Sequence, residues 1–263
     1  MTEIISKNAE EGWATFDDFT VGIATNRLPN TNHWVGKELK IEFENNKVLE
    51  LAFGEEKVKW SWDGEQDEDV YEEVCTSPDH YFFDIYFSKR ANEALTIVMN
   101  TQTRRVISVR CIMRDKAPEG DARVAHEFLV GVIQGGTPSG EVPGPTRELI
   151  GYRSLNEYSP NLVWEHFYVN SKRYAWQGIK GVSRGLGDMD YATAYKLEEN
   201  MYVFAFREKI VPCGSVFFFD YNIGRCTGKF IGITDEGKIT NTKAGAKIWK
   251  TSYNCYPPGY EPI

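Results

Sequence analysis

Short runs in which apolar and polar residues alternate cover most of the chain, and turn residues separate them. Pairs such as Asn45-Asn46 and Asp63-Gly64 are typical of hairpin connections. Because side chains on a strand point alternately to its two faces, this period of two predicts antiparallel strands packed around a core. In the first half, the predicted strands are Glu38–Glu44, Lys47–Phe53, Lys57–Trp62, Tyr81–Phe87, Leu95–Asn100, Arg105–Met113 and Glu127–Gln134.

The second half repeats this organisation. Aromatic residues make up 14% of the chain, which favours pleated, half-buried strands over helices. Short helical segments are expected at Asp188–Tyr195 and in a turn around Arg147–Gly151. The predicted strands are Val163–Val169, Arg173–Gly178, Ala192–Leu197, Met201–Glu208, Ser215–Tyr221, Arg225–Ile233 and Lys247–Ser252.

A Gly- and Pro-rich stretch without apolar periodicity separates the two sets of strands. It predicts a first domain over residues 1–134, a linker over 135–146 and a second domain over 147–263. The segments SPDHYFFDIYF, ALTIVMN and RVISVRCIM also match LEENMYVFAFRE, SVFFFDY and RCTGKFIGI in order. Duplication and the general similarity of meanders both explain this match. Closing each meander into its own barrel removes exposed edges, and one barrel built from both halves is the alternative.

Composition excludes some classes of partner. The net charge is −8 and basic residues do not cluster, so neither nucleic acid nor an anionic membrane is expected as a partner. The chain shows no leader pattern and no apolar run of membrane-spanning length. Five widely spaced cysteines favour a reducing compartment, so we expect a soluble, cytoplasmic protein. The four histidines lack metal-binding spacing, and no metal site is predicted.

The predicted strand Met201–Glu208 places Tyr202, Phe204, Phe206 and Glu208 on one face. A carboxyl group at the end of an aromatic row inside a barrel would resist ionisation and could transfer protons near neutral pH. In the alternative interpretation, Glu208 lies at a solvated strand end and pairs with a neighbouring basic residue.

The strand Val163–Val169 carries Trp164, His166 and Tyr168 on one face and two further large residues on the other. Both faces are partly aromatic, so periodicity leaves open which one points inward. His166 could act as a general base or could be an ordinary structural histidine.

The glycine-rich loop GVSRGLGD, residues 181–188, holds Arg184 between glycines. It could close on the carboxylate of a substrate, or it could be an ordinary surface loop. It does not link a strand to a helix as in dinucleotide-binding folds, so a phosphate-binding role is not predicted.

The segment FTVGIATNRLPNTNHWVGKELKIEF, the stretch from Thr146 to Tyr221 and TGKFIGIT resemble the molybdenum cofactor biosynthesis protein F (MoaF) family. The resemblance extends from about Phe19 to Pro262. It implies an all-β protein of two tandem calycin-like, or lipocalin-like, antiparallel barrels. It implies no particular reaction.

A more distant resemblance bears on chemistry. EYSPNLVWEHFYVNSKRYAW, the glycine-rich loop and MYVFAFRE are similar, in order, to segments of the phenolic acid decarboxylases. These single calycin barrels remove CO2 from hydroxycinnamates without a cofactor. The resemblance implies catalytic roles for Glu208, Arg184 and Tyr158. Asn156 stands where that family has a second tyrosine, and Phe87 stands at the glutamate position of the first half, so a site of this kind belongs to the second half.

Three functions follow as hypotheses. The first is a lyase that needs no cofactor and acts on a small aromatic substrate, with Trp176 and the aromatic residues above as ligand-binding walls. The second is a non-catalytic carrier of an apolar ligand in the same barrel. The third is an accessory protein in molybdenum cofactor, or pterin, metabolism.

Overall fold

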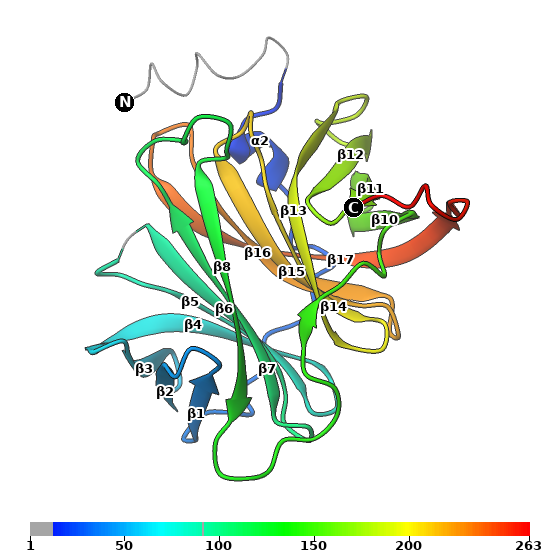
Figure 1. Cartoon of the computed structure of the whole chain (residues 1–263). Coiled ribbons are helices and arrows are strands. Elements are labelled where there is room, and N and C mark those ends of the chain that lie inside the picture. The colour runs from blue at the N-terminus through cyan, green and yellow to red at the C-terminus, as the bar shows by residue number, and fades with distance from the viewer. Residues whose placement is uncertain (1–12, 91) are drawn as a thin grey trace.

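The computed structural model describes residues 13–90 and 92–263, which form two closed antiparallel barrels packed side by side (Figure 1). In the N-terminal barrel each strand pairs with the next, and the first strand closes on the eighth. Its strands are β1 (Glu38–Phe43), β2 (Val48–Phe53), β3 (Lys57–Trp62), β4 (Glu65–Ser77), β5 (His80–Tyr86), β6 (Glu93–Asn100), β7 (Arg105–Met113) and β8 (Val124–Ile133).

The C-terminal barrel has the same up-and-down order, because its first strand pairs with its last and β12 pairs with β13. The short strand β9 (Gly144–Pro145) adds to the side of β13. The other strands are β10 (Tyr152–Ser159), β11 (Leu162–Asn170), β12 (Arg173–Lys180), β13 (Gly187–Glu198), β14 (Met201–Arg207), β15 (Cys213–Asp220), β16 (Arg225–Ile233) and β17 (Ile239–Tyr253).

The predicted all-β, two-barrel, calycin-like architecture is confirmed, and the alternative of one barrel built from both halves is wrong. The three matched segments are β5–β7 and β14–β16, which are the fifth to seventh strands of their respective barrels. The predicted linker over residues 135–146 lies between β8 and β10 and carries β9.

The barrel interiors differ in chemistry. The N-terminal lumen is filled by apolar side chains such as Ile97, Leu51, Phe83, Trp60 and Trp62. The C-terminal lumen is lined mainly by aromatic residues of several strands. These include Tyr158, Trp164, Tyr168, Tyr174, Tyr202, Phe204, Phe206, Phe217, Phe219 and Phe230.

The two barrels contact each other through their outer faces. Phe82 and Ile107 from one barrel and Val203 and Phe218 from the other belong to a single apolar cluster. Strands at this contact are therefore apolar on both faces, and every residue of β15 is buried. Two buried walls explain why these strands lack the strict alternation of an exposed sheet.

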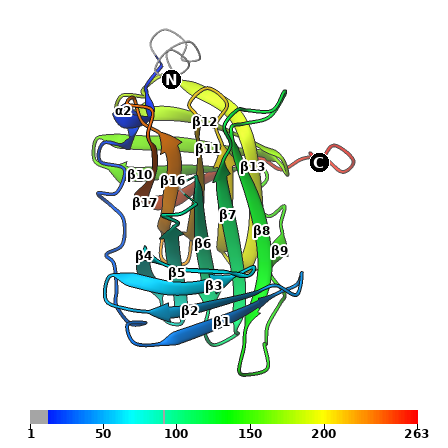
Figure 2. The same cartoon turned by 90° about the vertical axis from the view of Figure 1, so that its left-hand side faces the viewer.

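A short helix, α2 (Phe16–Thr20), lies across one end of the C-terminal barrel, far from β1–β3 (Figure 2). Thr15 begins it with a capping box, in which the Thr15 hydroxyl accepts from the Asp18 backbone N–H. Phe16 and Phe19 point into the aromatic core. Within the described part of the chain, no helix has the length and apolar character needed to span a membrane.

The helix predicted at Asp188–Tyr195 is wrong, because these residues belong to β13. Along β13, Asp190 and Ala192 are buried and their immediate neighbours are more exposed, which is the period of a strand. The small residues Gly187, Ala192 and Ala194 obscure this alternation in the sequence.

Candidate active site

The row of aromatic residues on β14 points into the C-terminal barrel. Tyr202, Phe204 and Phe206 belong to its core, whereas Val203 and Ala205 face the other barrel. Glu208 follows this row and is 91% buried, as its exposed fraction is 9%. Its backbone N–H donates to the Cys213 carbonyl at 3.0 Å, which fixes the turn. Glu208 is therefore not at a solvated strand end.

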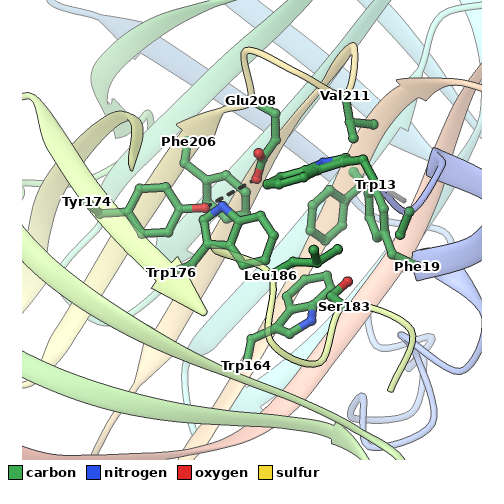
Figure 3. Close-up of a pocket in the computed structure, with 12 residues that line it drawn as sticks. Trp13, Phe19, Trp164, Tyr174, Trp176, Ser183, Leu186, Phe206, Glu208 and Val211 are labelled. Carbon is green, nitrogen blue, oxygen red and sulfur yellow. Dashed lines mark hydrogen bonds between the residues drawn. The ribbon is translucent and has the colours of Figure 1, made fainter. Parts of the chain in front are cut away.

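A cavity opens beside Glu208 at the end of the barrel that α2 covers (Figure 3). Its volume is about 20 Å3, room for about one water molecule. A cavity of this volume is too small for an aromatic molecule, so a ligand must displace part of the wall. The lining residues are Trp13, Ala14, Phe19, Trp164, Tyr174, Trp176, Ser183, Leu186, Phe206, Glu208, Val211 and Phe230.

A second carboxyl group lies next to Glu208. Asp190 on β13 is completely buried, and the two side chains share a hydrogen bond. Such a bond requires a proton on one of the two carboxyl groups. Burial, followed by the neighbouring charge of Asp190, raises the pKa of Glu208 well above its ordinary value.

The surrounding donors assign the proton to Glu208. Asp190 accepts from the indole N–H of Trp176 at 3.0 Å and from the backbone N–H of Lys209 at 3.2 Å. Burial raises the pKa of Asp190 above its ordinary value, and the bond from Trp176 opposes this rise, so Asp190 ionises more readily than Glu208. Glu208 has the Tyr174 hydroxyl at 3.5 Å from its Oε1, a longer contact. The pair therefore carries one proton and one negative charge.

The structure resolves which face of β11 points inward. Trp164 and Tyr168 belong to the barrel core, and the His166 ring lies 5.2 Å from that of Tyr174. On the opposite face, both oxygens of Glu165 accept from the Arg153 guanidinium, at 2.9 and 2.8 Å.

His166 is a buried, neutral imidazole. Burial lowers its pKa from 6.5 to about 3. Neither ring nitrogen has a hydrogen-bond partner among the described residues. An imidazole with so low a pKa is a weak base, but it can still donate and accept hydrogen bonds.

Tyr158 on β10 also points into this lumen. Its ring centroid lies 5.0 Å from that of Trp164, and its hydroxyl finds no hydrogen-bond partner in the described chain. Burial raises the pKa of Tyr158 well above 10.0, so the phenol stays protonated. Asn156, two residues earlier, donates to the Ser154 carbonyl at 3.2 Å.

Arg184 is not brought to Glu208. Its side chain is exposed and does not line the cavity, whereas its neighbour Ser183 does. The backbone of Arg184 forms a bridge with Gly178, where any side chain would overlap the Ser183 carbonyl. This close approach holds the glycine-rich loop against β12 with Arg184 directed to solvent.

Two other predicted wall residues lie at the opposite end of the barrel. The Tyr202 hydroxyl donates to Glu148 at 2.8 Å, and the Tyr168 hydroxyl lies 3.3 Å from that of Tyr221. Since β14 separates Tyr202 from Glu208 by its full length, Tyr202 cannot contact a ligand at the cavity.

The sequence did not reveal two residues of this site, one in the cavity wall and one behind Glu208. Trp13 comes from the segment before the first barrel, and its ring lies 5.9 Å from that of Trp176. Asp190 was hidden by the incorrect helix, and the alternation of Asp188, Asp190 and Ala192 was the signal that could have revealed it.

Comparison with known proteins places these barrels in a family. Residues 11–115 match the model of the MoaF N-terminal domain, and residues 143–253 match that of the MoaF C-terminal domain. The chain is also 32% identical over 237 residues to Protein MoaF of Klebsiella aerogenes, covering 85% of this chain and 87% of that protein. The chain belongs to the MoaF family.

Similarity to solved structures is weaker. A crystal structure from Burkholderia vietnamiensis, described as a candidate β-lactamase, matches with a TM-score of 0.34 and 12% identity, over 39% of this chain and 95% of that one. The DNA polymerase III β chain of Streptococcus pneumoniae matches with a TM-score of 0.14 and 7% identity, over 89% and 83%. Neither similarity bears on the site of this MoaF family member.

Proposed function

We propose that the C-terminal barrel of this MoaF-family protein binds a small aromatic molecule and transfers a proton to it from Glu208. The observation that carries the proposal is the hydrogen-bonded pair of Glu208 and Asp190, which borders an aromatic cavity. A carboxyl group that remains protonated near neutral pH is suited to general acid catalysis.

The two carboxyl groups have different roles in this proposal. Glu208 lines the cavity and gives up its proton, whereas Asp190 lies behind it and keeps its charge. After the transfer, two negative charges would face each other, which favours rapid reprotonation of Glu208. This chemistry suits a lyase in which the bond that breaks leaves its electron pair on a carbon atom, the other fragment departs as a neutral unsaturated product, and that carbon takes the proton of Glu208.

Ligand entry needs a change at the barrel mouth, because the cavity has a volume of only about 20 Å3. Trp13 and Phe19 belong to the segment that covers it, and Trp13 is half-buried. We propose that this segment moves outward to admit the ligand. Arg184 could reach the ligand only if the glycine-rich loop also turned inward.

The test begins with the ligand that co-purifies with the full chain, identified by mass spectrometry after denaturation. The purified protein is then incubated with that compound in D2O, and deuterium incorporation is followed by NMR. Glu208→Gln should abolish incorporation and retain binding, because glutamine keeps the shape and lacks the acidic proton. Glu199→Gln, at an exposed carboxylate outside the cavity, is the control. Undiminished incorporation in Glu208→Gln would refute the catalytic role.

A carrier without catalysis is the second candidate. The unpartnered Tyr158 hydroxyl and His166 nitrogens favour it, since a bound ligand could satisfy buried polar atoms without any reaction. A carrier would bind the co-purified compound and return it unchanged. A role as an accessory protein in molybdenum cofactor metabolism is proposed from the family resemblance. A cytoplasmic location is proposed from the cysteine pattern.

A further inference from the structure

The described residues that line the cavity beside Glu208 include no basic side chain. Among the described residues that line it, the ionisable ones are Tyr174 and Glu208. Asp190, directly behind Glu208, adds the negative charge of the pair. An anionic ligand would therefore enter a site that already repels it.

Three basic side chains near the cavity have partners outside it. The Lys209 ammonium lies 3.6 Å from an Asp188 carboxylate oxygen. The Arg207 and Arg173 guanidinium groups lie over the Tyr191 ring, at 5.2 and 3.6 Å from its centroid. Side chains alternate across a strand, so Arg207 points away from the lumen that its neighbours Phe206 and Glu208 face. These three basic residues and the solvent-exposed Arg184 do not balance the charge of the carboxyl pair in this structure, and a cationic ligand would.

The remaining wall is a cluster of tryptophan and phenylalanine rings. Trp176 lies between Trp13 and Trp164, with centroid distances of 5.9 and 6.0 Å. Phe19 lies 5.6 Å from Trp164 and 5.5 Å from Phe230. The electron-rich faces of such rings attract organic cations, and tryptophan does so most strongly. Aromatic rings next to a carboxylate form the kind of site that binds ammonium groups.

An independent observation also points to a ligand. The Trp164 indole N–H is buried, belongs to a residue that lines the cavity, and finds no hydrogen-bond partner in the described chain. A buried donor without an acceptor is costly, so a ligand that supplies an acceptor gains affinity. The Trp164 Nε1–H group can therefore donate a hydrogen bond to an oxygen or nitrogen acceptor of a ligand.

We infer that the ligand of this cavity is an organic ammonium compound with a flat apolar body and a hydrogen-bond acceptor. Its ammonium group faces Glu208 and Asp190, its body lies among the tryptophans, and its acceptor meets Trp164. The inference rests on the proposed binding site and names its ligand class, and it is independent of whether a proton is transferred.

Three probes that differ in one group test this on the full chain by isothermal titration calorimetry. 3-(4-Hydroxyphenyl)propylamine, 3-(4-hydroxyphenyl)propan-1-ol and 3-(4-hydroxyphenyl)propanoate share a ring, a chain and a phenolic oxygen that can accept from Trp164, and they end in an ammonium, a hydroxyl and a carboxylate group. We expect the amine to bind at least about tenfold more tightly than the alcohol, and the carboxylate to bind most weakly. Equal or tighter binding of the alcohol or carboxylate would overturn the inference and leave the proposed site intact. If none binds, the site itself fails, and both proposals with it.

Variants locate the effect. Asp190→Asn should weaken amine binding about tenfold and leave alcohol binding nearly unchanged, because it removes charge and keeps shape. If Asp190→Asn does not fold, Trp13→Leu provides the same comparison from the opposite wall, since it removes an aromatic face. Glu199→Gln is again the control and should bind like the unmodified protein. Equal losses for amine and alcohol in both variants would show that packing, and not cation recognition, determines affinity.

Discussion

Asp190 and Glu208 lie beside the Tyr191–Arg207 pair of the β13–β14 ladder, so the two carboxyl groups meet across adjacent strands. Like charges placed this way repel, and the pair relieves the repulsion by keeping one proton.

The raised pKa of Glu208 should appear in the pH dependence of stability. The folded protein holds this proton above the ordinary carboxyl value of 4.5, where the unfolded chain releases it. The contribution of Glu208 to the free energy of unfolding is therefore largest at acid pH and falls as pH rises toward the folded pKa. Glu208→Gln should flatten the decline in urea midpoint across this interval. A slope as steep in Glu208→Gln as in Glu199→Gln would contradict the assignment.

His166 should have the opposite effect. Its folded pKa of about 3 lies below the ordinary value of 6.5, so the unfolded chain binds the extra proton first. Stability should fall as pH drops from 6.5 toward 3, by up to about 1.4 kcal/mol per pH unit for this group. His166→Phe should lose less stability between pH 7 and 5, measured by urea unfolding. An equal loss of stability in His166→Phe and the unmodified protein would contradict this assignment.

Lys229 should be essential to the contact between the barrels. Its ammonium lies 3.4 Å from Glu72 and 3.5 Å from the fully buried Asp84. Lys229→Met would leave the Asp84 charge with less compensation, at a cost of about 3–5 kcal/mol in the free energy of unfolding. Lys238→Met removes an exposed ion pair with Glu236 and should cost less than about 1 kcal/mol. Similar losses in the two variants, measured by chemical denaturation, would show that Lys229 has no special role.

Gly232 should control how α2 sits on the barrel. A Cβ added there would overlap the Phe16 ring, so Gly232→Ala should push α2 outward. We expect faster hydrogen–deuterium exchange over residues 13–23, and exchange in β5–β8 like that of the unmodified protein. Gly144→Ala is the control, because a Cβ there meets nothing within 4 Å. Unchanged exchange over residues 13–23 would mean that the ring adjusts without moving the helix.

Most strands of the two barrels could be predicted from the sequence. Two could not, because one begins with an acidic run and the other has polar residues on its buried face. β4 begins with the acidic run Glu65–Asp69, which faces largely outward and hides the alternation. β10 has Ser154, Asn156 and Tyr158 inside, so its buried face reads as polar. Periodicity recognises apolar interiors, and it therefore failed in a strand that lines the aromatic lumen.

The candidate site was predictable only within single strands. The row that ends in Glu208 follows from alternation along β14 alone. The partnership with Asp190 depends on the register between two strands, and the position of Trp13 depends on how a distant segment folds back. The role suggested for Arg184 depends on loop geometry, which residue spacing does not determine, and its side chain is exposed in this structure.

The helix α2 belongs to the second barrel in space and precedes the first barrel in sequence. During synthesis, the ribosome therefore releases the segment that carries Trp13 and Phe19 before strands β1–β17, and the cavity wall is complete only when β16 supplies Phe230. A fragment that begins at residue 147 would contain Asp190 and Glu208 and lack Trp13 and Phe19. The aromatic residues that line the cavity would then be exposed to water. The cavity of the second barrel therefore needs a segment that precedes the first barrel in the chain, and the two barrels are also joined through their shared apolar surface.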